Sequence, residues 1–273
     1  MKKLFAIILV AIMLCGCSAN KGDGASSQPL TDYPATAFDI TVKNCPQKVI
    51  SLSPEVTDII FALGSDAQLI GISKDCVSEK ELARYGTSAM PDIEAIKAAK
   101  PDLVFVTDYA YADDIRLLSD AKIKVAQVKG AAEYIGLGNI YNNIAVLMSG
   151  EITGTRNAAN TFKNIDGKIK SAANSNSKKV KAAIFVNDTV TLEKGCVSAE
   201  LVKLAGINTL IGGSDSQIIK AKPDIILCPT GSSEAFTARF DGIKVKELDP
   251  SLLDRRGVKM VDVVTQIISV LEE

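Results

Sequence analysis

Histidine is absent from the 273 residues, and so is tryptophan. Without histidine the chain cannot build a Ser-His-Asp or Cys-His catalytic group, a histidine-ligated zinc or manganese site, or an imidazole ligand to haem iron. An excess of one charge is also lacking, since 31 Lys and Arg residues stand against 32 Asp and Glu residues. No basic stripe interleaved with aromatic residues occurs, so we expect no nucleic-acid partner.

A membrane-spanning run is lacking as well, because the apolar run at residues 4–14 (LFAIILVAIML) is shorter than the roughly 20 residues that a span requires. The run follows two lysines and ends in small residues, as in a secretory signal peptide. Residues 14–17 (LCGC) resemble the bacterial lipobox, whose cysteine takes a diacylglycerol. We therefore expect residues 1–16 to be cleaved and Cys17 to be lipidated, which predicts an extracytoplasmic, membrane-anchored lipoprotein. The alternative is an ordinary signal peptide with Cys17 as an incidental thiol.

The remaining cysteines are Cys45, Cys76, Cys196 and Cys228. Two of them fall in each half of the chain, so Cys45–Cys76 and Cys196–Cys228 are candidate disulfides outside the cytosol. The alternative is that all four are small buried apolar side chains. None of the spacings is that of a zinc site, and we expect neither a resident metal nor a cofactor.

Residues 17–36 are rich in Ser, Gly, Ala, Asp and Lys, which predicts a lipidated flexible tether. Beyond the tether, short aliphatic runs alternate with helical patterns, and this favours β-α-β units around mainly parallel sheets. In the first half we expect strands at residues 48–52, 69–72 and 102–106 and helices at 55–63 and 92–99. In the second half we expect strands at residues 182–186, 209–211 and 225–228 and a helix at 198–205.

The two halves also match in their letters. TDIIFALG at residues 57–64 corresponds to AELVKLAG at 199–206, and AAKPDLVFV at 98–106 corresponds to KAKPDIILC at 220–228. Because the two matches occur in the same order, we interpret them as a duplicated lobe.

Between the halves, apolar residues recur at mostly three- to five-residue intervals from Ile140 to Ile169. This periodicity predicts one long helix, with an interruption near Gly150 or Gly154. The expected fold is α/β, with two similar lobes joined by one long α-helix and a ligand cleft between the lobes. The predicted bounds are 37–135 for the N-terminal lobe, 136–176 for the linking helix and 177–273 for the C-terminal lobe.

Several segments resemble the substrate-binding lipoproteins of ABC importers for iron-siderophore complexes and cobalamin. The most specific are VISLSPEVTDIIFALGSDAQLIGISKDC at residues 49–76 and MPDIEAIKAAKPDLVFVTDYAY at 90–111. Weaker matches are LVKLAGINTL at 201–210, KPDIIL at 222–227 and LLDRRG at 252–257. The resemblance implies a monomeric binding protein rather than an enzyme, with an ABC permease in the membrane as its partner.

In such a fold the ligand loops follow the carboxyl ends of parallel strands. The expected ligand contacts are Ser53, Pro54, Lys74, Asp75, Asp108, Tyr109 and Tyr111 in the first lobe, and Asn187, Asp188, Thr230, Arg255 and Arg256 in the second. Tyrosine rings suit stacking on a flat ligand, and arginines suit carboxylate or catecholate oxygens.

The resemblance also implies a permease-docking residue. Glu94 matches an acidic residue that meets basic residues of the transporter in this family. The corresponding second-lobe position is Ser216, which leaves its neighbour Asp215 as a substitute.

The second lobe departs from the family in its loops. The segments between Gly206 and Pro223 and at residues 230–241 are shorter than usual, and without tryptophan an aromatic cleft wall is missing or built from tyrosine. We predict a protein that captures an iron-siderophore or other metal chelate and delivers it to a permease. A corrinoid stays open as the ligand, because residues 51–76 are closer to the cobalamin branch.

Two further functions stay open. The chain could be a surface lipoprotein that keeps the fold but has lost transport, acting as a sensor or an interaction module. It could instead be an extracellular hydrolase, with Ser53 or Ser198 as nucleophile and a lysine as base, although no suitable motif surrounds either serine.

Overall fold

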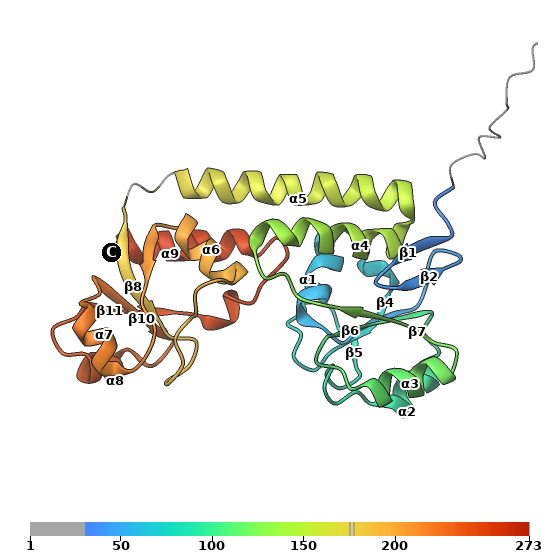
Figure 1. Ribbon diagram of the computed structural model, residues 1–273, viewed down its shortest axis with the longest axis horizontal. Helices are drawn as coiled ribbons and strands as arrows, with labels where there is room; N and C mark the ends of the chain where they lie inside the picture. Colours follow the sequence, from blue (N-terminus) through green and yellow to red (C-terminus); the bar gives the residue numbers. More distant parts are fainter. Residues whose placement is uncertain (1–30, 175, 177, 273) are drawn as a thin grey trace, which may run out of the picture. The chain divides into compact units, whose positions relative to one another are not determined.

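The computed structural model describes residues 31–174, 176 and 178–272 (Figure 1). The predicted signal peptide, the predicted lipidation site at Cys17 and most of the predicted tether lie outside these residues. Within the described part, none of the helices combines the length and the apolar character that a membrane crossing needs.

The first lobe is built on a parallel sheet, the first-lobe sheet, which has five strands in the described chain in the order β5-β4-β3-β6-β7. The strands are β3 (Val49–Ser51), β4 (Leu69–Ile72), β5 (Ala83–Arg84), β6 (Leu103–Thr107) and β7 (Lys124–Val128). The helices that connect them are α1 (Pro54–Ala62), η1 (Asp66–Gln68), α2 (Ile93–Ala99) and α3 (Ala112–Asp120).

The second lobe repeats this plan on the second-lobe sheet, whose four described strands are parallel in the order β11-β10-β8-β9. The strands are β8 (Val180–Ile184), β9 (Ile207–Leu210), β10 (Ile225–Pro229) and β11 (Val245–Leu248). The helices are α6 (Val197–Leu204), α7 (Asp215–Ala221), α8 (Ser233–Arg239), η3 (Pro250–Leu252) and α9 (Met260–Glu272).

The duplication inferred from the letters extends to small details of the backbone. The central strands β3 and β8 each shift register after their first residue, against β4 and β9 respectively. Asp102 and Asp224 occupy matching places, since each carboxylate accepts a hydrogen bond from the backbone N–H at the start of the central strand, at 2.9 Å from Lys48 and 2.7 Å from Lys181. The two lobes are therefore structural repeats.

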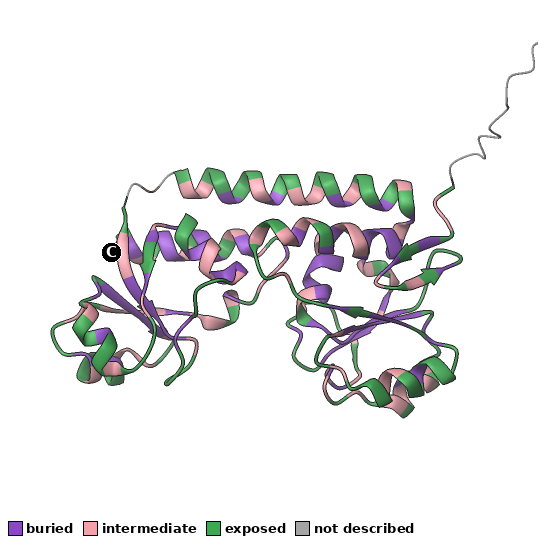
Figure 2. Cartoon of the chain, viewed as in Figure 1, coloured by how far each residue is buried: buried purple, intermediate pink, exposed green. Residues whose placement is uncertain are grey.

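Helices cover both faces of each sheet, and Figure 2 shows the strands as the buried layer. In the first lobe, Ile50 and Val104 point toward the α2 and α3 side, whereas their neighbours Val49 and Leu103 point toward α1 and α4, as expected from the alternation of side chains along a strand. The cluster on the α1 side continues into the second lobe, where it includes residues of α6 and α9. The two lobes thus share one apolar core.

The predicted interruption of the linking helix is present at Gly150, but it divides the segment into two helices instead of interrupting one. Residues 136–176 form two described helices, α4 (Leu137–Ser149) and α5 (Glu151–Asn174), which are separated by Gly150 at φ +91° and lie alongside each other (Figure 1). Helix α4 follows η2 (Tyr134–Gly136) and packs on α1 and on β1 (Ala35–Ala37), which pairs with β2 (Ile40–Val42). Helix α5 contacts both α4 and α9, so the long helix that joins the lobes is α5 alone.

The predicted tether ends earlier than residue 36. Asp32 already belongs to the folded part of the chain, because its carboxylate caps α5. It accepts hydrogen bonds from the backbone N–H groups of Ile152 at 3.1 Å and Thr153 at 2.8 Å. These bonds lower the pKa of Asp32. The folded part therefore begins before residue 37, the predicted start of the N-terminal lobe.

The candidate disulfides are not formed, because all four cysteines in the described part are free thiols. Cys45 lies 3.4 Å from the backbone oxygen of Met148, and Cys76 contacts the Thr57 hydroxyl at 3.2 Å. Cys196 caps α6 through a hydrogen bond from the Ala199 N–H, and Cys228 is buried in the second lobe. Each thiol has its own local contacts instead of a partner cysteine.

Candidate functional site

A hollow of about 250 Å³ opens at the carboxyl ends of β3, β6 and β7. It brings together Ser53, Asp108 and Tyr109, three residues that the sequence predicts as ligand contacts, with Glu55 and Lys129. We call it the strand-end hollow. Its position is where open α/β sheets bind ligands, because the connecting loops leave the sheet at this edge.

Ser53, which lines the strand-end hollow, and Pro54, which does not, begin helix α1. The Ser53 hydroxyl accepts a hydrogen bond from the Val56 N–H at 3.3 Å, and Pro54 follows as the first helical residue. This is the ordinary chemistry of a helix N-terminus, in which a serine cap precedes a proline whose missing N–H is not needed. Ser53 is buried and Pro54 is exposed, so Pro54 presents the more accessible surface.

The most accessible of the predicted contacts are the two tyrosines after β6. Tyr109 is 78% exposed and Tyr111 is 65% exposed. Met90, which sequence reasoning missed, is a further exposed apolar side chain in the turn after β5. Exposed aromatic and thioether groups along one edge of a sheet can cover a flat ligand.

The other loop residues are placed by local hydrogen bonds. In the first lobe, Lys74 and Asp75 are exposed after β4, and the Asp75 N–H donates to the Ser73 hydroxyl at 3.2 Å. In the second lobe, the Asn187 side-chain oxygen accepts from the Val190 N–H at 2.8 Å and thereby folds its own turn.

Beside that turn, the Asp188 backbone oxygen accepts from Arg239 at 2.5 Å. Thr230 is exposed after β10. Asn187 and the Asp188 backbone are thus engaged within the second lobe, whereas Lys74, Asp75 and Thr230 are surface residues.

The two predicted arginines are engaged with the protein. Arg255 forms an ion pair with Asp58 of α1, with Nε 2.7 Å from Oδ2, and the exposed fractions of the two side chains are 13% and 9%. The Arg256 N–H donates to the same carboxylate at 3.1 Å, and the Tyr141 hydroxyl donates to the Arg256 backbone oxygen at 2.6 Å. We call Asp58, Arg255, Arg256 and Tyr141 the interlobe clasp, because they join α1 and α4 to the segment after β11.

Burial raises the pKa of Asp58, and the Arg256 N–H and the Arg255 guanidinium offset part of that rise. Burial also raises the pKa of Tyr141 far above its ordinary value of 10, so its hydroxyl remains a hydrogen-bond donor. Sequence reasoning missed both residues. One signal was available, since Asp58 falls between the apolar residues Val56 and Ile59 on a helix, where a buried acid needs a partner.

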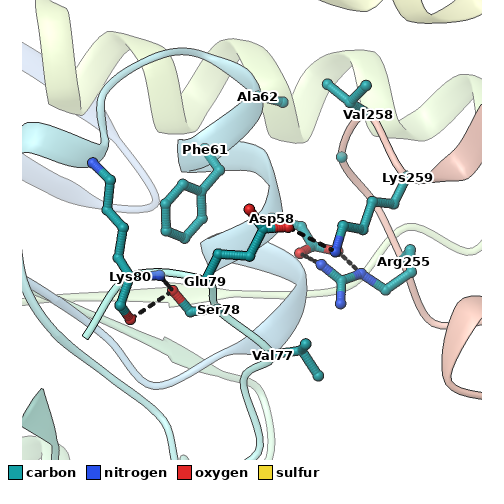
Figure 3. A pocket seen from close by; sticks show the side chains of 11 residues that line it. Asp58, Phe61, Ala62, Val77, Ser78, Glu79, Lys80, Arg255, Val258 and Lys259 are labelled. Carbon is teal, nitrogen blue, oxygen red and sulfur yellow. Dashed lines mark hydrogen bonds and ion pairs between the residues drawn. The ribbon is translucent and has the colours of Figure 1, made fainter. Parts of the chain in front are cut away.

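A second cavity, of about 290 Å³, lies beside the clasp (Figure 3). Its walls come from α1, from residues 77–80 and from residues 255–259, and they include the apolar side chains of Phe61, Val77 and Val258. Arg255 is the one residue among the predicted ligand contacts that lines it. This cavity is therefore separate from the strand-end hollow.

The two predicted docking residues differ in their freedom. Glu94 is 86% exposed in the first turn of α2 and lies 3.1 Å from Lys97. Asp215 begins α7 and is held by Arg239, whose guanidinium also lies 5.0 Å from the centre of the Phe240 ring. This ion pair lowers the pKa of Asp215. Both acids therefore have a cationic neighbour, but Glu94 is 86% exposed beside Lys97, whereas Asp215 is 43% exposed in its pair with Arg239.

The structure gives little support to hydrolysis by a serine nucleophile or to a metal site. The hydroxyl of Ser198, one candidate nucleophile, is buried and donates to the Leu253 backbone oxygen at 2.6 Å, and that of Ser53 caps α1. Among the residues that the structure describes, no group of three or more Cys, Asp or Glu side chains is arranged to hold a metal ion.

Comparison with known proteins bears on the whole chain. The family model described as "Periplasmic binding protein" matches residues 49–244. A Bacillus subtilis (strain 168) protein named "Uncharacterized ABC transporter substrate-binding lipoprotein YvrC" is 26% identical over 299 aligned positions, which cover 96% of this chain and 94% of that protein.

Two solved structures share the fold. The apo form of the periplasmic heme-binding protein RhuT from Roseiflexus sp. RS-1 has a TM-score of 0.68 at 15% identity and covers 82% of this chain and 97% of its own. The periplasmic vitamin B12 binding protein BtuF of Vibrio cholerae has a TM-score of 0.64 at 18% identity and covers 83% and 98%.

Proposed function

The chain belongs to the periplasmic binding protein family, and on that premise we propose that it is the solute-binding component of an ABC importer. It captures a metal chelate or a corrinoid between its lobes and delivers it to a permease in the membrane. The observation that carries this proposal is the strand-end hollow, where Tyr109 stands exposed at the ligand-binding edge of a duplicated α/β fold.

The relatives support the same role. The Bacillus subtilis protein, which matches this chain over nearly its whole length, is named as a substrate-binding lipoprotein of an ABC transporter. The two solved structures are named for heme and vitamin B12, which are both large flat metal chelates. A binding role without catalysis is consistent with serine hydroxyls that are occupied by backbone groups.

The ligand preference shifts once the contacts are known. The sequence favours an anionic iron-siderophore because of Arg255 and Arg256, but both arginines belong to the interlobe clasp. The exposed rings of Tyr109 and Tyr111 remain, and they suit a flat face. Ferric siderophores, haemin and cobalamins therefore all belong in the ligand panel.

The location is part of the proposal. We infer that the chain is cleaved before Cys17, carries a diacylglycerol there, and acts outside the cytoplasm as a monomer. Metabolic labelling with a radioactive fatty acid should mark the wild-type chain and leave a Cys17→Ser variant unmarked. Labelling of the variant would place the lipid elsewhere and contradict this part of the proposal.

The ligand is tested on the full-length protein in detergent. A ligand present at 100 times its dissociation constant stabilises the folded state by about 2.7 kcal/mol, which a thermal shift detects. Because the chain has six tyrosines and no tryptophan, quenching of tyrosine fluorescence gives a second measurement. If no member of the panel shifts the melting temperature or quenches the fluorescence, the proposal fails.

A second candidate function is a sensor or interaction module that no longer serves a permease. The observation that favours it is the asymmetry of the docking residues, since the Asp215 side chain is 43% exposed in its pair with Arg239 while that of Glu94 is 86% exposed. Stimulation of a reconstituted permease's ATPase by the loaded protein would support transport. Ligand binding without any such stimulation would support the sensor.

A further inference from the structure

The cavity of about 290 Å³ beside the interlobe clasp takes no part in the proposed function (Figure 3). We call it the junction cavity. One wall is helix α1 with Phe61 and Ala62, and another is the segment at residues 257–259 of the second lobe. Gly257 allows this segment to approach α1 closely, because a Cβ there would stand 2.6 Å from the Asp58 backbone oxygen. The junction cavity therefore has walls from both lobes.

The apolar side chains of the junction cavity are accessible from solvent. Val77, in the segment between β4 and β5, is 60% exposed, and Val258 is 50% exposed. Single exposed valines are ordinary on a protein surface, but these two line one cavity together with the ring of Phe61. A molecule in the cavity can contact all three side chains and remove their apolar surface from water, which favours binding.

The volume of the junction cavity indicates the size of the apolar group that fits it. A closed apolar cavity of about 150 Å³ is large enough to bind benzene. The junction cavity has about twice that volume. It therefore suits a bicyclic ring or an acyl chain of medium length.

The charged residues of the junction cavity favour an anion over a cation. Its described lining has three cations and two acids, which are Lys80, Arg255, Lys259, Asp58 and Glu79. The carboxylate of Asp58 is already held by Arg255 in the interlobe clasp. Lys80 forms an ion pair with Asp66, which lies outside the lining, and its Nζ is 6.0 Å from the centre of the Phe61 ring.

The pair of Lys259 and Glu79 is much looser. The two charged atoms are 3.9 Å apart, and the Glu79 side chain is 92% exposed. An exposed ion pair of this kind is weak, because both groups are well solvated when they separate. A carboxylate bound in the cavity can therefore take the place of Glu79 beside Lys259.

We propose that the junction cavity is a second binding site, which takes a small amphipathic carboxylate. The apolar body of the ligand packs on Phe61, Val77 and Val258, and its carboxylate accepts hydrogen bonds from Lys259. Such a ligand contacts both lobes and adds to the interlobe clasp. The site is separate from the strand-end hollow, so its test does not require the transported ligand to be known.

The test uses the full-length protein in phosphatidylcholine nanodiscs, with empty nanodiscs as the blank. The probes share one bicyclic ring and differ in charge: 2-naphthoate is the anion, 2-naphthamide is neutral, and 2-naphthylmethylammonium is the cation. Dissociation constants are measured by titration calorimetry at pH 7. Melting curves check that each variant folds.

The variants address the wall and the cation of the junction cavity separately. Val258→Asp places a carboxylate on the apolar wall, and Lys259→Gln removes the cation. Val190→Asp and Lys163→Gln are the matched controls, because Val190 is 48% exposed, Lys163 is also exposed, and neither belongs to the lining. Tyr109→Ser changes the strand-end hollow instead.

We expect wild type to bind 2-naphthoate at least about tenfold more tightly than 2-naphthamide, and the ammonium probe most weakly, because a charge-assisted hydrogen bond is stronger than a neutral one. In Lys259→Gln the affinities for the naphthoate and the naphthamide should agree within about twofold. Val258→Asp should weaken 2-naphthoate at least about tenfold, because like charges then meet on the wall. The two controls and Tyr109→Ser should bind 2-naphthoate as wild type does.

Several results would overturn the proposal. Wild type would show no saturable binding of 2-naphthoate, or it would bind the amide or the ammonium probe equally well. A folded Val258→Asp that binds 2-naphthoate as wild type does, or a Tyr109→Ser that loses it, would place the probe elsewhere. If Val258→Asp does not fold, Lys259→Gln decides, because an unchanged preference for the carboxylate would also overturn the proposal. None of these results bears on the proposed function, which the ligand panel tests.

Discussion

Removing Asp58 should destabilise the protein strongly. In Asp58→Ala the guanidinium of Arg255 stays at the lobe junction without its counter-charge, and it is almost fully buried there. Breaking a buried ion pair from one side costs about 3–5 kcal/mol, because the remaining charge is left uncompensated. Folded domains are stable by only about 5–15 kcal/mol, so this loss is a large part of the total.

The expected shift in melting temperature follows from the size of the chain. For domains of this length each kcal/mol moves the melting temperature by about 2–4 °C, so Asp58→Ala should melt roughly 6–20 °C below wild type. The variant also loses the acceptor for the Arg256 N–H. Circular dichroism or differential scanning fluorimetry at pH 7 measures the shift directly.

Two comparisons isolate the cause. The exposed pair of Asp113 and Arg116 on α3 is the matched control, with 3.2 Å between the charged atoms, and Asp113→Ala should change stability by less than about 1 kcal/mol. The double variant Asp58→Ala with Arg255→Met removes both charges and should be less destabilised than the sum of the single variants. If Asp58→Ala melts like Asp113→Ala, or if the two clasp variants are additive, the account of the clasp is wrong.

Three further predictions follow from other parts of the molecule. Gly154→Ala should lower the free energy of unfolding in urea by about 1–3 kcal/mol, because the new Cβ would stand 2.3 Å from the Ala145 backbone oxygen. Gly167→Ala, which has open space around it on the same helix, should raise that free energy by about 1 kcal/mol. Equal effects of the two variants would contradict the close approach of α4 and α5. Glu55→Gln should raise the melting temperature at neutral pH, because a carboxyl group whose pKa is raised in the folded state opposes folding when it is ionised. The gain in melting temperature should shrink as the pH falls toward 4.5, the ordinary pKa of the group. A gain that does not depend on pH would refute this prediction. Glu94→Lys should abolish stimulation of the permease's ATPase while ligand affinity is kept, and a loss of both would argue against a docking role.

The regular elements could be predicted from the sequence because their signals are local. The strand predicted at residues 69–72 has those bounds as β4, and the helix predicted at 55–63 is α1, one residue earlier. Each strand is an aliphatic run bounded by turn residues. Helix α1 is followed by Gly64, whose φ of +69° prevents the helix from continuing. The lobe duplication was visible for the same reason, since the matched letters fall on matched elements.

The linking helix shows where local signals stop. Helices α4 and α5 each bury one apolar stripe, so the apolar period continues through the turn at Gly150 and resembles that of one helix. The reversal depends on Asp32, which lies more than a hundred residues earlier and caps α5. A long-range hydrogen bond of this kind leaves no periodic trace in the sequence.

The candidate site was predictable in position but not in its partners. Topology alone places Ser53, Asp108 and Tyr109 at one sheet edge, and the strand-end hollow brings them together. Arg255 was predicted as a ligand contact because its loop follows the last strand, yet its partner Asp58 is 197 positions away. An exposed arginine and a clasped arginine have the same sequence signature, and only packing tells them apart.

The shared core and the clasp together determine how this protein can discriminate between ligands. One apolar cluster runs through both lobes, and the clasp crosses the junction with an ion pair and two hydrogen bonds. A wide hinge closure would have to break these contacts, and so a ligand gains little from inducing it. Binding to a preformed site avoids the cost of ordering, but the selectivity must then come from atoms that are already in place.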